Sequence, residues 1–355
     1  MKIGFLGLPG SGKTTLFNLV TGRETDPSEL GRAEARLGVV KVPDPRLNRL
    51  AEIFHSAKII EPEIVFVDLL ALHRAEDAHP RDDSLTKVAG DADAFALVIQ
   101  CFGELDHQGN PLDPVADLEA LLLELTIADL GIVERRLERL EAELKSARDK
   151  TSTERDLLRR VEAHLSAGGL VRDLELRESE EVLLRGFHLF TAKPLLVVCN
   201  VAEDDPKGAA CAPVAAFAET RGLNTIAIAA TLEQEIARLD GDSRAEFLAD
   251  YGIEEPARDR FIRACYRLLD LITFFTGDRP EAHGWTITAG STAREAAGKI
   301  HTDFYKGFIR AEVVPFAKLD ELGTLAACKE AGVMRMEGRD YVVEDGDYML
   351  VHFSR

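Results

Sequence analysis

The sequence lacks long apolar runs and closely spaced cysteines, and each absence excludes a class of protein. No run approaches the roughly 18 residues needed to span a membrane, and the N-terminus has the composition of a core strand rather than of a signal peptide. The protein is therefore expected to be cytoplasmic. The five cysteines never form a C-x-x-C pair, so neither a disulfide framework nor a zinc site is indicated, and we expect them to be reduced and structural. They are Cys101, Cys199, Cys211, Cys265 and Cys328.

Basic residues are also fewer than acidic residues in this sequence. The chain has 43 Lys and Arg against 62 Asp and Glu, for a net charge of −19. Coating a nucleic acid requires clustered Lys and Arg, so a general nucleic-acid-binding role is not expected, although a local basic cleft remains open. An acidic surface is common among cytosolic proteins, and the length of 355 residues predicts two or three domains.

The N-terminal segment contains a phosphate-binding pattern. Residues 2–6 predict a short buried strand, residues 7–14 read Gly-Leu-Pro-Gly-Ser-Gly-Lys-Thr, and the apolar spacing of residues 15–20 predicts a helix. This is a P-loop between the strand and the helix that it requires. Side chains must be absent where the backbone N–H groups wrap a phosphate chain, which explains Gly7, Gly10 and Gly12. The pattern predicts nucleoside triphosphate binding.

Three side chains are expected to supply the chemistry of this loop. Lys13, the candidate catalytic residue, would reach the β- and γ-phosphates, and the Thr14 hydroxyl can ligate Mg²⁺. Residues 64–68 form an apolar run that ends in Asp68, as expected of a buried parallel strand that carries a carboxylate to its C-terminal edge. Downstream of a P-loop, Asp68 is expected to hold Mg²⁺ opposite Thr14 rather than to serve only as a turn residue.

The remaining pattern predicts a doubly wound α/β domain that is interrupted by helices. Further strands are expected at 37–42, 94–101, 194–200 and 225–229, with a helix at 46–55. Leu and Val recur three and four residues apart between residues 130 and 165, which indicates an antiparallel helical hairpin over 117–165. Helices are expected within 213–272, and strands at 285–287, 311–314, 341–343 and 348–351 predict a compact C-terminal α+β module.

Several stretches of the chain resemble the YchF subgroup of the Obg-related P-loop NTPases. They are residues 38–47 (Gly-Val-Val-Lys-Val-Pro-Asp-Pro-Arg-Leu), 271–276 (Leu-Ile-Thr-Phe-Phe-Thr), 297–312 and 337–347. The resemblance covers essentially the whole length. It implies a doubly wound, mostly parallel sheet, an inserted antiparallel coiled coil and a C-terminal TGS domain, which is a small β-grasp module. The corresponding division is 1–116 and 191–276 for the nucleotide-binding domain, 117–190 for the insertion and 277–355 for the TGS domain.

The resemblance also implies which base is bound. Typical GTPases carry Asn-Lys-x-Asp, whose carboxylate binds guanine, whereas this chain has Asn200-Val201-Ala202-Glu203, similar to the Asn-x-x-Glu form that the family uses to accept adenine. ATP is therefore expected to be preferred, with GTP as the second candidate. The expected nucleotide-binding residues are Gly10, Ser11, Gly12, Lys13, Thr14, Thr15, Asn200, Val201, Glu203, Ala230 and Thr231.

Two switch positions depart from the family pattern. The threonine that closes on Mg²⁺ and the γ-phosphate aligns with Arg32, and the second switch carries Ala71 where the family has glycine. The leading interpretation is a nucleotide switch with slow Mg²⁺-dependent hydrolysis, for which K⁺ is a further candidate cofactor. The resemblance implies that it meets the ribosome or RNA through the TGS domain and the coiled-coil arm. No membrane partner and no DNA specificity are indicated.

Two other functions remain open. Arg32 and Ala71 favour a hydrolysis-deficient nucleotide-binding scaffold as the alternative. A small-molecule kinase built on the same loop would need an acceptor pocket and a lid with phosphate-facing arginines, and the TGS-like C-terminus is evidence against it.

Overall fold

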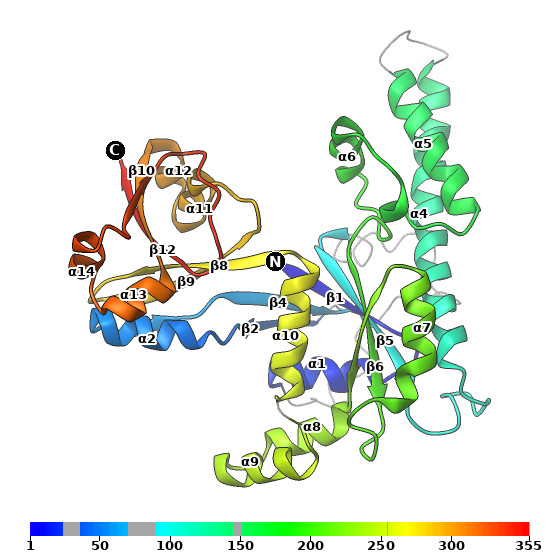
Figure 1. Ribbon diagram of the computed structural model, residues 1–355. Coiled ribbons are helices and arrows are strands. Elements are labelled where there is room, and N and C mark those ends of the chain that lie inside the picture. Colours follow the sequence, from blue (N-terminus) through cyan, green and yellow to red (C-terminus); the bar gives the residue numbers. More distant parts are fainter. Residues whose placement is uncertain (24–35, 70–89, 145–150, 254, 355) are drawn as a thin grey trace. The chain divides into compact units, whose positions relative to one another are not determined.

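The computed structural model describes residues 1–23, 36–69, 90–144, 151–253 and 255–354. The chain divides into two compact units: Met1–Gly38 with Val65–Phe261, and Val39–Ile64 with Ile262–Arg355. The described residues form two six-stranded sheets (Figure 1). Among the described helices, none has the length and the apolar character that crossing a membrane requires.

The first sheet has the strand order β2-β4-β1-β5-β6-β7. Its strands are β1 (Lys2–Leu6), β2 (Arg36–Lys41), β4 (Glu63–Asp68), β5 (Ala94–Cys101), β6 (Leu195–Val201) and β7 (Asn224–Ile228). The five strands from β4 to β7 in this order are parallel. The expected doubly wound, mostly parallel sheet is therefore confirmed. Because parallel strands end at the same edge, the segments that follow β1, β4, β5 and β6 converge there.

Helices cover both faces of this sheet. Helices α1 (Lys13–Thr21) and α10 (Ala257–Leu268) contribute Phe17 and Phe261 to one face, where they pack with Phe5 and Phe66 of the strands. The other face carries an apolar core with α4 (Pro114–Leu144) and α7 (Ala212–Thr220). Two shorter helices follow β7, namely α8 (Ala230–Ala237) and α9 (Gly241–Asp250).

Helices α4 and α5 (Thr151–Ser166) form the expected antiparallel hairpin (Figure 1). Its buried seam consists of Val133, Leu137 and Leu140 from α4 and Leu157, Leu158, Val161 and Leu165 from α5. At its base, the fully buried carboxylate of Asp129 accepts bonds of 2.7 Å from the Phe190 N–H, the Thr191 N–H and the Thr191 hydroxyl. These bonds attach the hairpin to the segment that leads into β6. In the chain, η1 (Val171–Asp173) and α6 (Glu178–Arg185) lie between α5 and β6.

The second sheet has the order β11-β10-β12-β8-β9-β3. Its strands are β3 (Lys58–Ile60), β8 (Leu271–Gly277), β9 (Glu281–Thr288), β10 (Phe308–Pro315), β11 (Arg335–Glu337) and β12 (Asp347–Phe353). Its helices are α2 (Pro45–Phe54), α11 (Ala293–Ile300), α12 (Thr302–Gly307), α13 (Phe316–Leu322) and α14 (Leu325–Glu330). An antiparallel β8–β9 hairpin with β12 parallel to β8 is the arrangement of the expected β-grasp module.

Two sequence-based boundaries in this region are wrong. The helix expected to reach residue 272 ends at Leu268, because Asp270 takes a left-handed conformation (φ 47°) and β8 begins at Leu271. The strand expected at 341–343 is absent from the described fold, since Val342 forms only an isolated bridge with Thr292.

Candidate functional site

The loop between β1 and α1 comes very close to neighbouring backbone and side chains. Gly12, the residue before α1, has a φ of 80°, and a Cβ there would lie 2.0 Å from Asn200 Nδ2. A Cβ on Gly7 would lie 2.6 Å from the Val98 carbonyl oxygen. Side chains are thus excluded at both positions. Because α1 begins at Lys13, its free N–H groups and its positive dipole end face the loop, which suits an anion.

Lys13 is folded against the end of β4. Its side chain donates to the Leu69 carbonyl oxygen over 3.2 Å, its ammonium lies 4.0 Å from Asp68 Oδ1, and the residue is only 8% exposed. Burial lowers the pKa of Lys13, nearby Asp68 raises it, and Arg36 lowers it further. The structure therefore holds a desolvated ammonium beside the loop, where a phosphate would provide its counter-charge.

Asp68, the last residue of β4, has one oxygen that accepts no hydrogen bond within the described part of the chain. Its side chain is completely buried, and Oδ2 forms an ion pair with Arg36. Oδ1 is buried and has no hydrogen-bond partner among the described residues. A buried carboxylate oxygen of this kind suits Mg²⁺, which prefers oxygen ligands. Thr14 and Thr15, whose hydroxyl groups are further oxygen ligands, lie half-buried in the first turn of α1. These residues can therefore hold the expected metal.

Arg36 is a cation that the sequence pattern did not identify. It opens β2, pairs with Asp68, and lies over the Phe17 ring at 5.4 Å from the centroid. No sequence signal distinguished it, because the strand was expected to begin one residue later and an arginine at a strand end is ordinarily solvated. The two expected switch positions, Arg32 and Ala71, lie outside the described residues.

Asn200 connects the P-loop to the segment that follows β7. Its Nδ2 donates to the Ser11 carbonyl oxygen over 3.0 Å, and its Oδ1 accepts from the Ala230 N–H over 3.2 Å. The side chain is 4% exposed. Both ends of the amide thus bind protein backbone, which fixes the distance between the two loops.

The other expected base-loop residues occupy different depths. Val201 ends β6 and Ala230 begins α8, and both are buried. Glu203 lies in the turn after β6 and Thr231 lies in the first turn of α8, and both are exposed. Of the expected site residues, the structure thus brings Ser11, Gly12, Asn200 and Ala230 into one cluster and leaves Glu203 and Thr231 at the surface.

The loop after β5 is a part of the site that the sequence pattern missed. His107 Cβ lies 3.0 Å from where a Cβ on Gly10 would be, and a Phe102 ring carbon lies 3.8 Å from the same point on Gly12. Gln100 holds the loop by donating to the Phe102 and Leu105 carbonyl oxygens over 3.1 Å each. The available signal was positional, because β5 is an apolar strand whose C-terminal end was expected at the same sheet edge as the P-loop.

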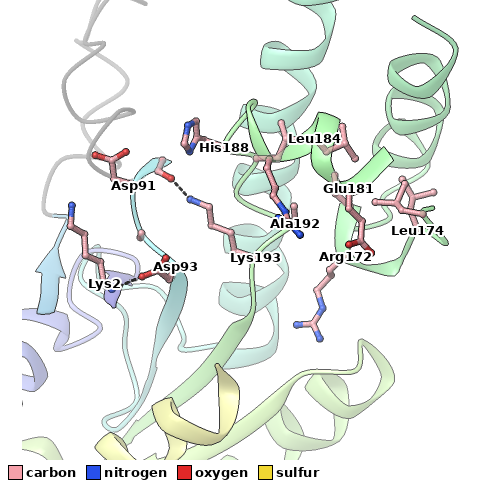
Figure 2. A pocket seen from close by; sticks show the side chains of 16 residues that line it. Lys2, Asp91, Asp93, Arg172, Leu174, Glu181, Leu184, His188, Ala192 and Lys193 are labelled. Carbon is pink, nitrogen blue, oxygen red and sulfur yellow. Dashed lines mark hydrogen bonds between the residues drawn. The ribbon is translucent and has the colours of Figure 1, made fainter. Parts of the chain in front are cut away.

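A separate cavity of about 790 Å³ lies at the opposite ends of these strands. Lys2, Asp93 and Lys193, at or just before the starts of β1, β5 and β6, line it together with residues of η1 and α6. Figure 2 shows charged side chains of both signs next to Leu174 and Leu184. Lys193 donates to the Gly90 carbonyl oxygen, and burial lowers its pKa. None of the expected nucleotide-binding residues lines this cavity.

Comparisons with known proteins agree with this architecture. The family model YchF-GTPase_C, described as a protein of unknown function (DUF933), matches residues 271–354. The Ribosome-binding ATPase YchF of Haemophilus ducreyi is 38% identical over 99% of both chains. The protein of the same name from Bacillus subtilis is 36% identical over 99% of this chain and 98% of its own.

Two solved structures share the fold. The Schizosaccharomyces pombe YchF GTPase superposes with a TM-score of 0.84 at 24% identity, covering 99% of this chain and 97% of the other. A GTP-binding protein from Pyrococcus horikoshii superposes with a TM-score of 0.63 at 20% identity, over the full length of both chains. The full-length identity to the curated relatives, together with the P-loop site and the β-grasp module, shows that the chain belongs to the YchF family.

Proposed function

We propose that this chain is a nucleotide switch that binds ATP in preference to GTP and hydrolyses it slowly to the diphosphate and phosphate. The observation that carries the proposal is that side chains from three strand ends meet at the P-loop. Lys13 lies near Asp68, and the Asn200 side chain is bonded to the backbone of Ser11. The names of the relatives, Ribosome-binding ATPase YchF, support the same activity.

The phosphates would bind along Gly10, Ser11 and Gly12, with Lys13 as the main side-chain counter-charge. This placement is supported by the exclusion of a Cβ at Gly12 and by the desolvation of the Lys13 ammonium. Asp68 and Thr14 would hold Mg²⁺, which neutralises charge on the β- and γ-phosphates when bound. K⁺ is a further candidate cofactor, because charge neutralisation has to compensate for the absence of a glutamine after Asp68.

The base would bind between the loop after β6 and the start of α8. Asn200 would position the two loops, and Val201, Glu203, Ala230, Thr231 and Thr15 complete the proposed binding set. Glu203 is longer than the aspartate of guanine-binding loops, and Val201 stands where those loops carry lysine, which supports a preference for adenine. His107 lies beside Gly10 and is proposed to help orient the attacking water, because no glutamine follows Asp68 to do so.

The proposed partner is the ribosome or its RNA. The names of the curated relatives support the ribosome. We propose that the TGS domain (277–355) and the coiled-coil arm (117–190) make the contact, and that the cytoplasm is therefore the site of action. The boundaries at residues 116, 190 and 276 remain predictions. Sedimentation of the purified protein with ribosomes, compared with a variant lacking residues 130–165, tests the arm.

Single-turnover hydrolysis of ATP at stoichiometric protein, with Mg²⁺ and K⁺, tests the catalytic proposal. We expect slow, Mg²⁺-dependent release of phosphate that is lost in Lys13→Ala. Tight ATP binding without phosphate release would instead favour a nucleotide-binding scaffold. One observation favours that second function: the Arg36 guanidinium occupies an oxygen of Asp68, the carboxylate that would hold Mg²⁺.

A further inference from the structure

Three cysteines that are far apart in the sequence lie together in the first unit. Cys101 ends β5, Cys199 lies within β6, and Cys211 ends η2 (Ala209–Cys211), the turn that leads into α7. The β5–β6 register pairs Ile99 with Cys199 and Cys101 with Val201. Residues two apart in a strand share a face, so Cys101 and Cys199 point to the same side of the sheet. The three sulfur atoms all lie within 4.8 Å of one another.

This cluster lies in an apolar and almost closed environment. The exposed fractions are 6% for Cys101, 0% for Cys199 and 5% for Cys211, and all three belong to the apolar core between the sheet and helices α4 and α7. The chain has two more buried cysteines, Cys265 and Cys328, which belong to the second unit and are not part of the group. Burial alone is therefore not what distinguishes the three, whereas their mutual proximity is.

We propose that Cys101, Cys199 and Cys211 form a three-sulfur binding site for one thiophilic cation of the Cu(I) class. An ion at the centre of a triangle with edges of 4.8 Å would lie about 2.8 Å from each sulfur, and thiolate bonds to ions such as zinc are about 2.3 Å. Small side-chain rotations close that difference. The sequence pattern indicated no metal site because the ligands have no C-x-x-C spacing and are assembled only by the sheet.

The number of ligands selects the class of ion. Among the described residues, no fourth thiol, imidazole or carboxylate joins the three sulfurs. Structural zinc sites are almost always four-coordinate, whereas soft thiolate ligands without oxygen or nitrogen partners suit Cu(I). One thiol releases its proton to solvent when the ion binds, so that the single positive charge of Cu(I) balances one thiolate in the apolar core, and the other two sulfurs bind as neutral thiols.

The proposed entry path for the ion is the turn that carries Cys211. Its neighbours Ala210 and Ala212 are exposed. The turn is held from outside by Asp205, whose carboxylate accepts from the Ala209 and Ala210 N–H groups over 2.8 Å each. Cys211 can therefore reach solvent through movement of one short turn, without separation of β5 from β6.

A competition titration tests the site. The reduced, full-length protein is titrated anaerobically with the bicinchoninate complex of Cu(I), and we expect it to withdraw one equivalent of copper. X-ray absorption at the copper edge should then report three sulfur neighbours. The double variant Cys199→Ala/Cys211→Ala should bind at least about 100-fold more weakly. The matched control Cys265→Ala/Cys328→Ala removes the same number of buried thiols from the second unit and should bind copper like the natural protein.

Thermal melting of each variant accompanies the titration. If the double variant does not fold, the single variant Cys211→Ser, which changes one sulfur to oxygen at nearly the same size, decides in its place. Failure of the natural protein to withdraw copper would overturn the proposal. Equal copper binding by the natural protein and the cluster variants would also overturn it.

Discussion

Asn200 donates a hydrogen bond to the main-chain carbonyl oxygen of Ser11, across 189 residues of sequence, at 3.0 Å. The same amide accepts from the Ala230 N–H. Asn200 thus links the loop proposed to hold the phosphates to the segment proposed to hold the base, and its two hydrogen bonds fix their separation. This role depends on the two hydrogen bonds of the Asn200 side chain and not on the identity of the bound base, so it can be tested with either nucleotide.

Replacement of Asn200 by alanine should loosen both loops. The change leaves the Ser11 carbonyl and the Ala230 N–H without their side-chain partner, which costs about 1–3 kcal/mol of unfolding free energy and lowers nucleotide affinity about tenfold or more. Urea denaturation and a titration with a fluorescent ATP analogue measure the two effects. The exposed Glu203→Ala in the same loop is the control for stability. Unchanged affinity in Asn200→Ala would show that the clamp does not position the site.

Lys13→Ala should abolish tight triphosphate binding while the fold is retained. The ammonium is buried, its pKa is lowered by that burial, and it is the main side-chain counter-charge available at the loop. Equilibrium dialysis with ATP should show a loss of affinity of at least about 100-fold. Lys207→Ala, an exposed lysine of the same unit, should bind normally. Normal ATP affinity in a folded Lys13→Ala protein would refute the proposed site.

Arg36→Ala should change the requirement for Mg²⁺. Without magnesium, the variant leaves the buried Asp68 carboxylate with only the Lys13 ammonium, 4.0 Å from Oδ1, as its counter-charge, which should lower the unfolding free energy by up to about 3–5 kcal/mol. With nucleotide present, both Asp68 oxygens become available, and half-saturation should occur at about tenfold lower Mg²⁺. Magnesium titrations of stability and of nucleotide binding measure both. Arg36→Lys keeps the charge and should resemble the natural protein, and an identical Mg²⁺ dependence in Arg36→Ala would contradict the prediction.

The base preference can be reversed in the loop after β6. Val201→Lys with Glu203→Asp rebuilds the guanine signature, and a gain of two good hydrogen bonds is worth roughly 1–3 kcal/mol, a shift of about tenfold or more toward GTP. Competition between ATP and GTP measures the shift. Equal affinities that the double substitution does not change would leave the loop without a discriminating role. A preference for GTP in the natural protein would mean that a different group binds guanine.

His283 should make the second unit less stable in mild acid. The imidazole ring stacks on the Trp285 ring, with the two ring centroids 3.6 Å apart. Burial lowers the pKa of His283 below 6.5, and nearby Glu281 only partly opposes this shift. The folded protein therefore binds the proton less readily than the unfolded chain. Stability is fully present above about pH 6.5 and decreases as the pH falls below it. The free energy of unfolding, measured from pH 7.5 to 5, should therefore fall with decreasing pH. His283→Phe should reduce this dependence on pH, whereas His301→Ala, at an exposed histidine, should leave it unchanged.

Local patterns predicted the parts of the site that depend on one segment. The glycines of the P-loop and Lys13 could be recognised because a phosphate loop demands fixed spacing within one short segment. Asp68 could be recognised because it ends an apolar strand downstream of that loop, and the leucine seam of the hairpin follows from the helical period alone. The sequence could not predict that Arg36 pairs with Asp68, that His107 lies beside Gly10, or that three cysteines meet. Those contacts depend on strand order and register, which the composition of a single segment does not determine.

The insertion of a helical hairpin between β5 and β6 has a consequence for how the protein is made. The P-loop emerges first during synthesis, but its clamp requires Asn200 and Ala230, which follow on the order of ten seconds or more later at about 5–20 residues per second. The hairpin is built from local contacts and can close before then, which shortens the effective gap that β6 must bridge to reach β5. Tight binding of nucleotide is thus expected only when the first unit is nearly complete, and a chain released before residue 230 would lack one end of the clamp.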